Sequence, residues 1–92
     1  IIVYDGFSPN GDGINDYFII EGLDKRPNHK VTIINRWGNK VYEASPYLND
    51  WEGTNMFGVS LGSDKLPVGT YFYIIDPGNG DPVKKGYIYL DY

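Results

Sequence analysis

Cysteine is absent from this chain of 92 residues, which therefore forms no disulfide and carries neither a thiol nucleophile nor a zinc–thiolate site. Basic residues are also few, eight against twelve acidic ones, and they are adjacent only at Lys25-Arg26 and Lys84-Lys85. A net charge of −4 with so little basic clustering argues against nucleic acid or an anionic membrane surface as a partner. No apolar run has the length of a membrane-spanning helix or of a signal-peptide core. The sequence therefore predicts neither nucleic-acid binding nor direct membrane insertion.

Residues that carry catalysis are scarce as well. The only histidine, His29, stands in a polar segment, and no serine lies in a G-x-S-x-G turn. Gly11-x-Gly13 is not followed by a helical pattern that would direct an N-terminus at a phosphate. The carboxylates lie mostly in predicted turns, where solvated acids are expected, although the sequence alone does not exclude a glycosidase-like pair among its twelve Asp and Glu residues. We therefore expect a protein that is not an enzyme.

Short runs of β-branched and aromatic residues alternate with turn residues along the whole chain. Twelve glycines and six prolines indicate many turns, and no window has the 3.6-residue period of an amphipathic helix. The main strand predictions are Ile1–Asp5, Tyr17–Glu21, Val31–Arg36, Lys40–Glu43, Thr70–Ile75 and Tyr87–Tyr92. This spacing predicts an all-β protein, an Ig-like antiparallel β-sandwich of about seven short strands.

Two turns are predicted to have structural roles. Gly38-Asn39 separates two β runs and favours a hairpin, because the primed turns need positive φ at their centre. Trp37 precedes this pair, and we expect it to pack in the core or against the turn. Gly69 is expected to turn the chain into the strand that follows.

Nine tyrosines give the chain a high aromatic content. In the last strand Tyr87 and Tyr89 fall on one face, whereas Ile88 and Leu90 fall on the other together with Tyr92. Exposed aromatic rings can stack on sugars, and they can equally form cross-strand pairs that stabilise a sheet. We favour the cross-strand role.

The segment from Phe7 to Phe18 is dense in residues with special backbone roles. Its proline and glycines exclude a helix, and its Asn and Asp residues favour tight turns. The residues that we single out here as candidates for partner recognition are Ser8, Pro9, Asn10, Gly11, Asp12, Gly13, Asn15 and Asp16.

The same segment also has features of a calcium loop. Its oxygen ligands alternate as in the first part of an EF-hand-type loop, and the candidate metal ligands are Asn10, Asp12 and Asp16. Two departures oppose this reading, since Ser8 replaces the usual first Asp and Ile19 stands where the bidentate Glu belongs. The alternative is a set of turns in which these side chains bond backbone N–H groups. No other cofactor is indicated.

Five blocks of the sequence, in order, resemble the gliding-motility-associated C-terminal domain, which is the type B sorting domain of the type IX secretion system in Bacteroidota. The blocks are Phe7–Phe18, Ile34–Glu43, Asn49–Thr54, Leu66–Tyr73 and Gly86–Leu90. They are spread over nearly the whole length of the chain, from residue 7 to residue 90. The resemblance implies that residues 1–92 are a single C-terminal sorting domain cut from a larger secreted protein.

This resemblance also implies a function and partners. Such domains direct their parent protein from the periplasm through the outer membrane to the cell surface or the medium. The implied partners are the type IX translocon and a PorP/SprF-like outer-membrane protein, which would recognise a folded module. We expect the Ser8–Asp16 loop and the exposed edge of the Tyr87–Tyr92 strand to face the receptor. The alternatives are a purely structural role for that loop and a calcium-stabilised adhesion or carbohydrate-binding module.

Overall fold

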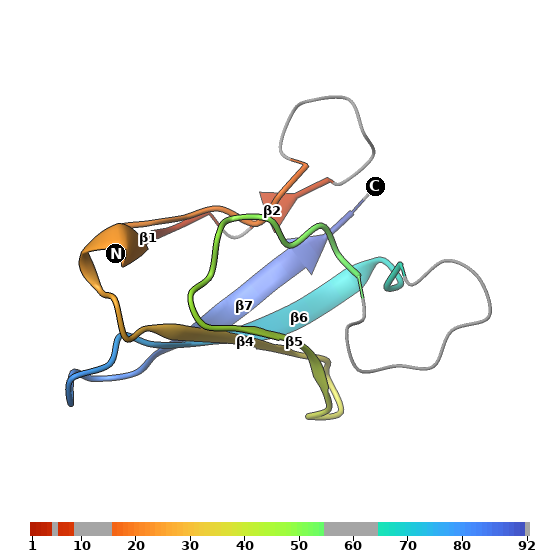
Figure 1. Cartoon of the computed structure of the whole chain (residues 1–92). Coiled ribbons are helices and arrows are strands. Elements are labelled where there is room, and N and C mark those ends of the chain that lie inside the picture. The colour runs from red at the N-terminus through yellow and green to blue at the C-terminus, as the bar shows by residue number, and fades with distance from the viewer. Residues whose placement is uncertain (5, 9–15, 55–64, 92) are drawn as a thin grey trace.

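The computed structural model describes residues 1–4, 6–8, 16–54 and 65–91 (Figure 1). Five strands form the main sheet in the order β2-β7-β6-β4-β5, and β1 and β3 form a small second sheet. The strands are β1 (Ile2–Val3), β2 (Gly6–Phe7), β3 (Ile20–Glu21), β4 (Lys30–Ile34), β5 (Lys40–Ala44), β6 (Gly69–Asp76) and β7 (Lys84–Leu90). The all-β, sandwich-like class that the sequence predicts is confirmed.

Helical structure is almost missing from the described residues. Their one helical element is the three-residue 3-10 turn η1 (Leu23–Lys25), and none of their helices has the length and apolar character to cross a membrane.

The long strands β6 and β7 alternate between a buried and an open face. Tyr71, Tyr73 and Ile75 of β6 are buried, as are Ile88 and Leu90 of β7. The residues between them point to the opposite face of the sheet, as the two-residue period of a strand requires. The predicted division of the last strand is therefore confirmed from Tyr87 to Leu90.

A second layer covers only one face of the main sheet. Figure 1 shows the small sheet and the green segment of residues 45–54 on the same side of the main sheet. Trp51 is 1% exposed in the core between the layers, where its ring centroid lies 5.3 Å from that of Phe7 and 6.3 Å from that of Phe18. The opposite face of the main sheet is left open by the described residues.

Hydrogen bonds of side-chain and backbone groups fix the covering segment in place. The Asn49 side chain accepts a hydrogen bond of 2.9 Å from the backbone N–H of Ile20 in β3, and the backbone N–H of Phe18 donates to the Trp51 carbonyl at 3.0 Å. The Trp51 indole donates to the Thr54 carbonyl at 2.9 Å. These contacts explain why the predicted Tyr17–Glu21 strand is confined to Ile20–Glu21: the backbone at Phe18 bonds to the loop instead of to a neighbouring strand.

The hairpin of β4 and β5 is confirmed, but its turn is longer than a two-residue primed turn. Asn35 Oδ1 accepts hydrogen bonds of 3.0 Å from the backbone N–H groups of both Trp37 and Asn39. Gly38 has a φ of 85°, whereas Asn39 is not in the positive-φ region. The Asn35 side chain therefore helps to stabilise the turn, which the sequence attributes to the Gly38-Asn39 pair alone.

Candidate recognition surfaces

Most of the predicted recognition loop lies outside the described residues. Of its eight candidates the structure describes Ser8 and Asp16, both half-buried. Pro9, Asn10, Gly11, Asp12, Gly13 and Asn15 fall in the undescribed part. The described residues contain no group of three or more His, Cys, Asp or Glu residues that could hold a metal ion. Calcium binding through Asn10, Asp12 and Asp16 therefore stays a prediction.

The other predicted recognition residues lie on the open face of the main sheet. Tyr87 is 61% exposed, and the strand register pairs it with Phe72, which is paired in turn with Ile34. Tyr89 is 50% exposed and is paired with Thr70. An aromatic and apolar stripe thus crosses three strands, which fits the cross-strand role and also leaves the rings accessible. Tyr92 lies outside the described residues.

The last strand does not present a free edge at its end, and this prediction was wrong. β2 pairs with β7 in parallel, Gly6 opposite Tyr89 and Phe7 opposite Leu90. The backbone N–H of Asp91 also bonds to the Phe7 carbonyl at 3.3 Å. This pairing is parallel within an otherwise antiparallel set of described strands. Strand addition at the end of β7 would have to displace β2.

A charged cluster occupies another part of the open face. Glu43 Oε2 lies 3.1 Å from Lys40 Nζ and 3.4 Å from Lys30 Nζ, and the Thr32 hydroxyl donates to it at 3.3 Å. The hydrogen bond from Lys40, followed by the charges of both lysines, lowers the pKa of the Glu43 carboxyl. This cluster holds β4 and β5 together by interactions that water screens.

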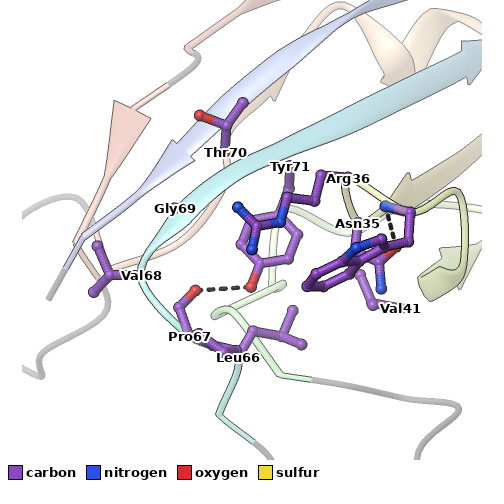
Figure 2. Close-up of a pocket in the computed structure, with 10 residues that line it drawn as sticks. Asn35, Arg36, Val41, Leu66, Pro67, Val68, Gly69, Thr70 and Tyr71 are labelled. Atoms are coloured by element: carbon purple, nitrogen blue, oxygen red, sulfur yellow. Dashed lines mark hydrogen bonds between the residues drawn. The ribbon is translucent and has the colours of Figure 1, made fainter.

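A pocket opens at the end of the β4–β5 hairpin. Its volume is about 190 Å³, and it lies between the hairpin loop, which carries Asn35 and Arg36, and the segment from Leu66 to Tyr71 (Figure 2). The Tyr71 hydroxyl donates a hydrogen bond of 2.7 Å to the Pro67 carbonyl and so closes one side. Gly69 lines the pocket as the first residue of β6, with a φ of 152°, a conformation rare for other residues.

Trp37 lies at this pocket, outside the core, so of its two predicted positions the one in the core was wrong. The residue is 72% exposed. The centre of the Arg36 guanidinium lies 4.5 Å from the centroid of the Trp37 ring, a cation–π arrangement. Within the described part of the chain, Arg36 forms no ion pair.

Sequence reasoning missed this pocket as a surface. The sequence places Arg36 at the end of a predicted strand and Trp37 beside a turn, and nothing in it connects these residues with the segment from Leu66 to Val68. The available signal was their position: a large aromatic residue at the tip of a hairpin lies beyond the strands that would bury it.

The one histidine has a structural environment. His29 is 3% exposed; its Nε2 accepts a hydrogen bond of 2.8 Å from the backbone N–H of Tyr47, and its Nδ1 lies 2.6 Å from the Arg26 carbonyl. Both ring nitrogens are therefore engaged by the backbone, which leaves neither for proton transfer to a substrate.

Comparison with known proteins agrees with the resemblance noted in the sequence. The model of a family described as the CHU_C type IX secretion signal domain matches residues 1–90. A search of curated proteins found no match, and neither did a search of solved structures.

Proposed function

Because the chain belongs to the CHU_C family of type IX secretion signal domains, we propose that the export machinery recognises it as a folded module rather than as a linear peptide. A signal domain of this family directs export through the outer membrane to the cell surface or the medium. Its function implies contact with the type IX machinery. The proposal concerns the feature of the domain that this machinery recognises.

The observation that carries the proposal is that each exposed surface is formed by segments that are far apart in the sequence. The hairpin-end pocket combines residues 35–41 with residues 66–71, and the open-face stripe combines Ile34, Phe72 and Tyr87. Folding brings these segments together. A receptor that contacts either surface distinguishes the folded domain from an unfolded chain.

The proposal also names the receptor, the kind of parent protein and the absence of catalysis. The direct receptor is a PorP/SprF-like outer-membrane protein, and residues 1–92 form the C-terminal domain of a larger secreted protein. The domain contributes no catalysis, which is supported by a family that is not catalytic and by the structural environment of His29. The receptor-facing role of the Ser8–Asp16 loop and of Tyr87 and Tyr89 remains part of this proposal.

A secretion assay with a graded set of core variants tests recognition of the folded state. A fluorescent passenger fused to residues 1–92 is expressed in a bacterium that has a type IX system. Ile33, which is fully buried in β4, is replaced by Val, Ala or Asp. Removing buried methyl groups costs about 0.5–1.5 kcal/mol for Ile→Val and 2–5 kcal/mol for Ile→Ala, so the set spans a wide range of stability.

We expect the exported fraction to fall in step with the folded fraction of the purified domain. Immunoblots of the periplasm separate retained passenger from degraded passenger, and Lys84→Asp on the surface of β7 serves as a control that leaves the core intact. Export of the unfolded Ile33→Asp fusion at the wild-type level would show that a linear segment is sufficient and would overturn the proposal.

A further inference from the structure

We propose that the hairpin-end pocket is the contact site for the receptor and that it binds a protein segment in which an apolar side chain stands next to a carboxylate. This inference rests on the proposed recognition of the folded domain and names the surface and the chemistry of the partner.

The size of the pocket fits a single side chain. Pockets that bind drug-sized ligands and cofactors have volumes of roughly 300–1,000 Å³. The hairpin-end pocket holds about 190 Å³, which is too small for such a ligand. An inserted side chain from a partner protein matches this space.

The walls of the pocket are mainly apolar. They include Val41, Leu66, Pro67 and Val68. Leu66 is 7% exposed and belongs to the core, whereas Val68 is 52% exposed and forms an accessible rim. Insertion of an apolar side chain would remove this rim from water, at a gain of about 25 cal/mol for each Å² of apolar surface.

The charge of the pocket calls for an acidic partner. Arg36 lines it, and no acidic residue is found among its described lining residues. The guanidinium is held against Trp37, so a carboxylate would meet a donor fork that is already oriented. The chain as a whole carries a net charge of −4, which makes this basic position a local exception.

The fold does not account for the side chains of Arg36 and Trp37. The hairpin loop is fixed by the Asn35 side chain and by the positive φ of Gly38, and neither interaction uses the guanidinium or the indole. Trp, Arg and Tyr are the residues most enriched among those that dominate binding energy at interfaces. An exposed pair of these types beside an apolar pocket has the composition of such a centre.

Peptide selection tests the chemistry of the partner. Eleven-residue random peptides displayed on phage are selected on the folded domain. We expect the selected peptides to contain Asp or Glu next to Leu, Ile or Phe. Binding should fall about tenfold or more in Arg36→Glu and in Trp37→Ala, which corresponds to about 1.4 kcal/mol. It should change less than about twofold in the exposed controls Lys84→Glu and Leu48→Ala, because substitutions outside a binding site leave its contacts intact.

NMR of a synthetic selected peptide bound to the ¹⁵N-labelled domain locates the contact. We expect the indole N–H resonance of Trp37 to shift on titration, while that of the buried Trp51 stays in place. Three results would overturn the proposal: no enrichment of acidic peptides, equal binding to Arg36→Glu, or shifts confined to the open face around Tyr87. Preferential binding of the domain to vesicles of anionic phospholipid through Arg36 would overturn it as well, because the partner would then be a lipid surface.

The same variants in the secretion assay separate this inference from the proposed function. Arg36→Glu and Trp37→Ala should keep the melting temperature within about 4 °C, because surface substitutions change stability by about 0.5 kcal/mol or less. Their export should fall, whereas Lys84→Glu and Leu48→Ala are exported normally. If Ile33→Asp is retained while Arg36→Glu and Trp37→Ala are exported normally, the pocket is not the contact site and the proposed function stands. If Ile33→Asp is itself exported normally, the proposed function fails.

Discussion

The backbone N–H of Tyr47 donates a hydrogen bond of 2.8 Å to Nε2 of the buried His29 and thereby joins the covering segment to the start of the main sheet. Because Nε2 accepts this bond, the ring proton of the neutral imidazole is on Nδ1, which donates to the Arg26 carbonyl. The Ser45 hydroxyl adds a bond of 2.8 Å to the His29 carbonyl. His29, just before β4, therefore connects the residues that precede this strand with the segment that follows β5.

Replacing His29 with Ala should destabilise the domain strongly. The change leaves the buried backbone N–H of Tyr47 without its partner, and an unsatisfied buried group costs about 1–3 kcal/mol. The Arg26 carbonyl keeps the hydrogen bond of 3.1 Å from the His29 backbone N–H, so it stays satisfied. We expect the free energy of unfolding, measured by urea denaturation, to fall by about 1–3 kcal/mol. Asn28→Ala next to it, on an exposed residue, should change it by about 0.5 kcal/mol or less. Equal stability of the His29 variant would show that these bonds are dispensable.

Gly86 of β7 should not tolerate a methyl group. A Cβ at this position would overlap the ring and hydroxyl of Tyr73, a buried residue on the adjacent strand. Overpacking of this kind typically costs about 1–3 kcal/mol, which we expect for Gly86→Ala in thermal unfolding. Gly6→Ala is the matched control, since nothing lies within 4 Å of its added Cβ. Adding Tyr73→Leu to Gly86→Ala should recover part of the loss, and an absence of any recovery would contradict the steric explanation.

Alkaline pH should destabilise the domain, because two of its tyrosines ionise less readily in the folded state than in the unfolded state. Burial, followed by the nearby Asp50 carboxylate, raises the pKa of Tyr42 from 10.0 to about 12, and burial also raises the pKa of Tyr47. The folded state therefore favours the neutral phenols, so this stability is fully present below pH 10 and is lost as pH rises through the folded pKa values. We expect urea denaturation to show a steady loss of stability above pH 10, of order 1 kcal/mol from the partly exposed Tyr42 after solvent screening. Tyr42→Phe should flatten part of this decline, and an unchanged slope would assign it to other groups.

The exposed tyrosines of the last strand provide a test of the open face. Tyr87→Ala with Tyr89→Ala removes two exposed rings while it preserves the buried Ile88 and Leu90. Cross-strand pairs contribute about 0.2–1 kcal/mol each, so the domain should stay folded. Because the sequence singles out Tyr87 and Tyr89 for partner recognition, we expect the secretion assay to show reduced export of the fused passenger. Normal export would remove this face from the recognition surface.

Calcium provides a test of the undescribed loop. The sequence offers oxygen ligands but lacks the first Asp and the bidentate Glu of a complete site, and we expect no calcium-dependent stability. The melting temperature should therefore agree between buffers with 5 mM CaCl₂ and with EDTA, because a ligand that does not bind the folded state does not stabilise it. A rise with calcium that Asp12→Ala abolishes would establish the site and favour the adhesion-module alternative.

The long strands could be predicted because their side chains repeat with a period of two. Burial of Ile88 and Leu90 against exposure of Tyr87 and Tyr89 follows from this period alone. The hairpin could also be predicted, since two β runs enclose a glycine that takes positive φ.

Features that depend on distant contacts could not be predicted in this way. β2 consists of two residues beside a turn-rich segment, so no local pattern indicates its parallel pairing with a strand more than eighty positions away. The covering segment has no repeating pattern, and its order comes from single bonds such as that of Asn49 to Ile20. Trp37 was misplaced because hydrophobicity predicts burial for an indole, whereas only the folded chain shows that nothing in its described part covers the hairpin tip.

The parallel pairing of β2 with β7 has a consequence for when the domain becomes complete. β7 lies between β2 and β6, so the first and final parts of the chain meet only after residues 84–90 have been synthesised. A domain that lacks residues 84–90 would have no strand between β2 and β6. Under the proposed recognition of the folded domain, loss of this one strand would be enough to keep the passenger inside the cell.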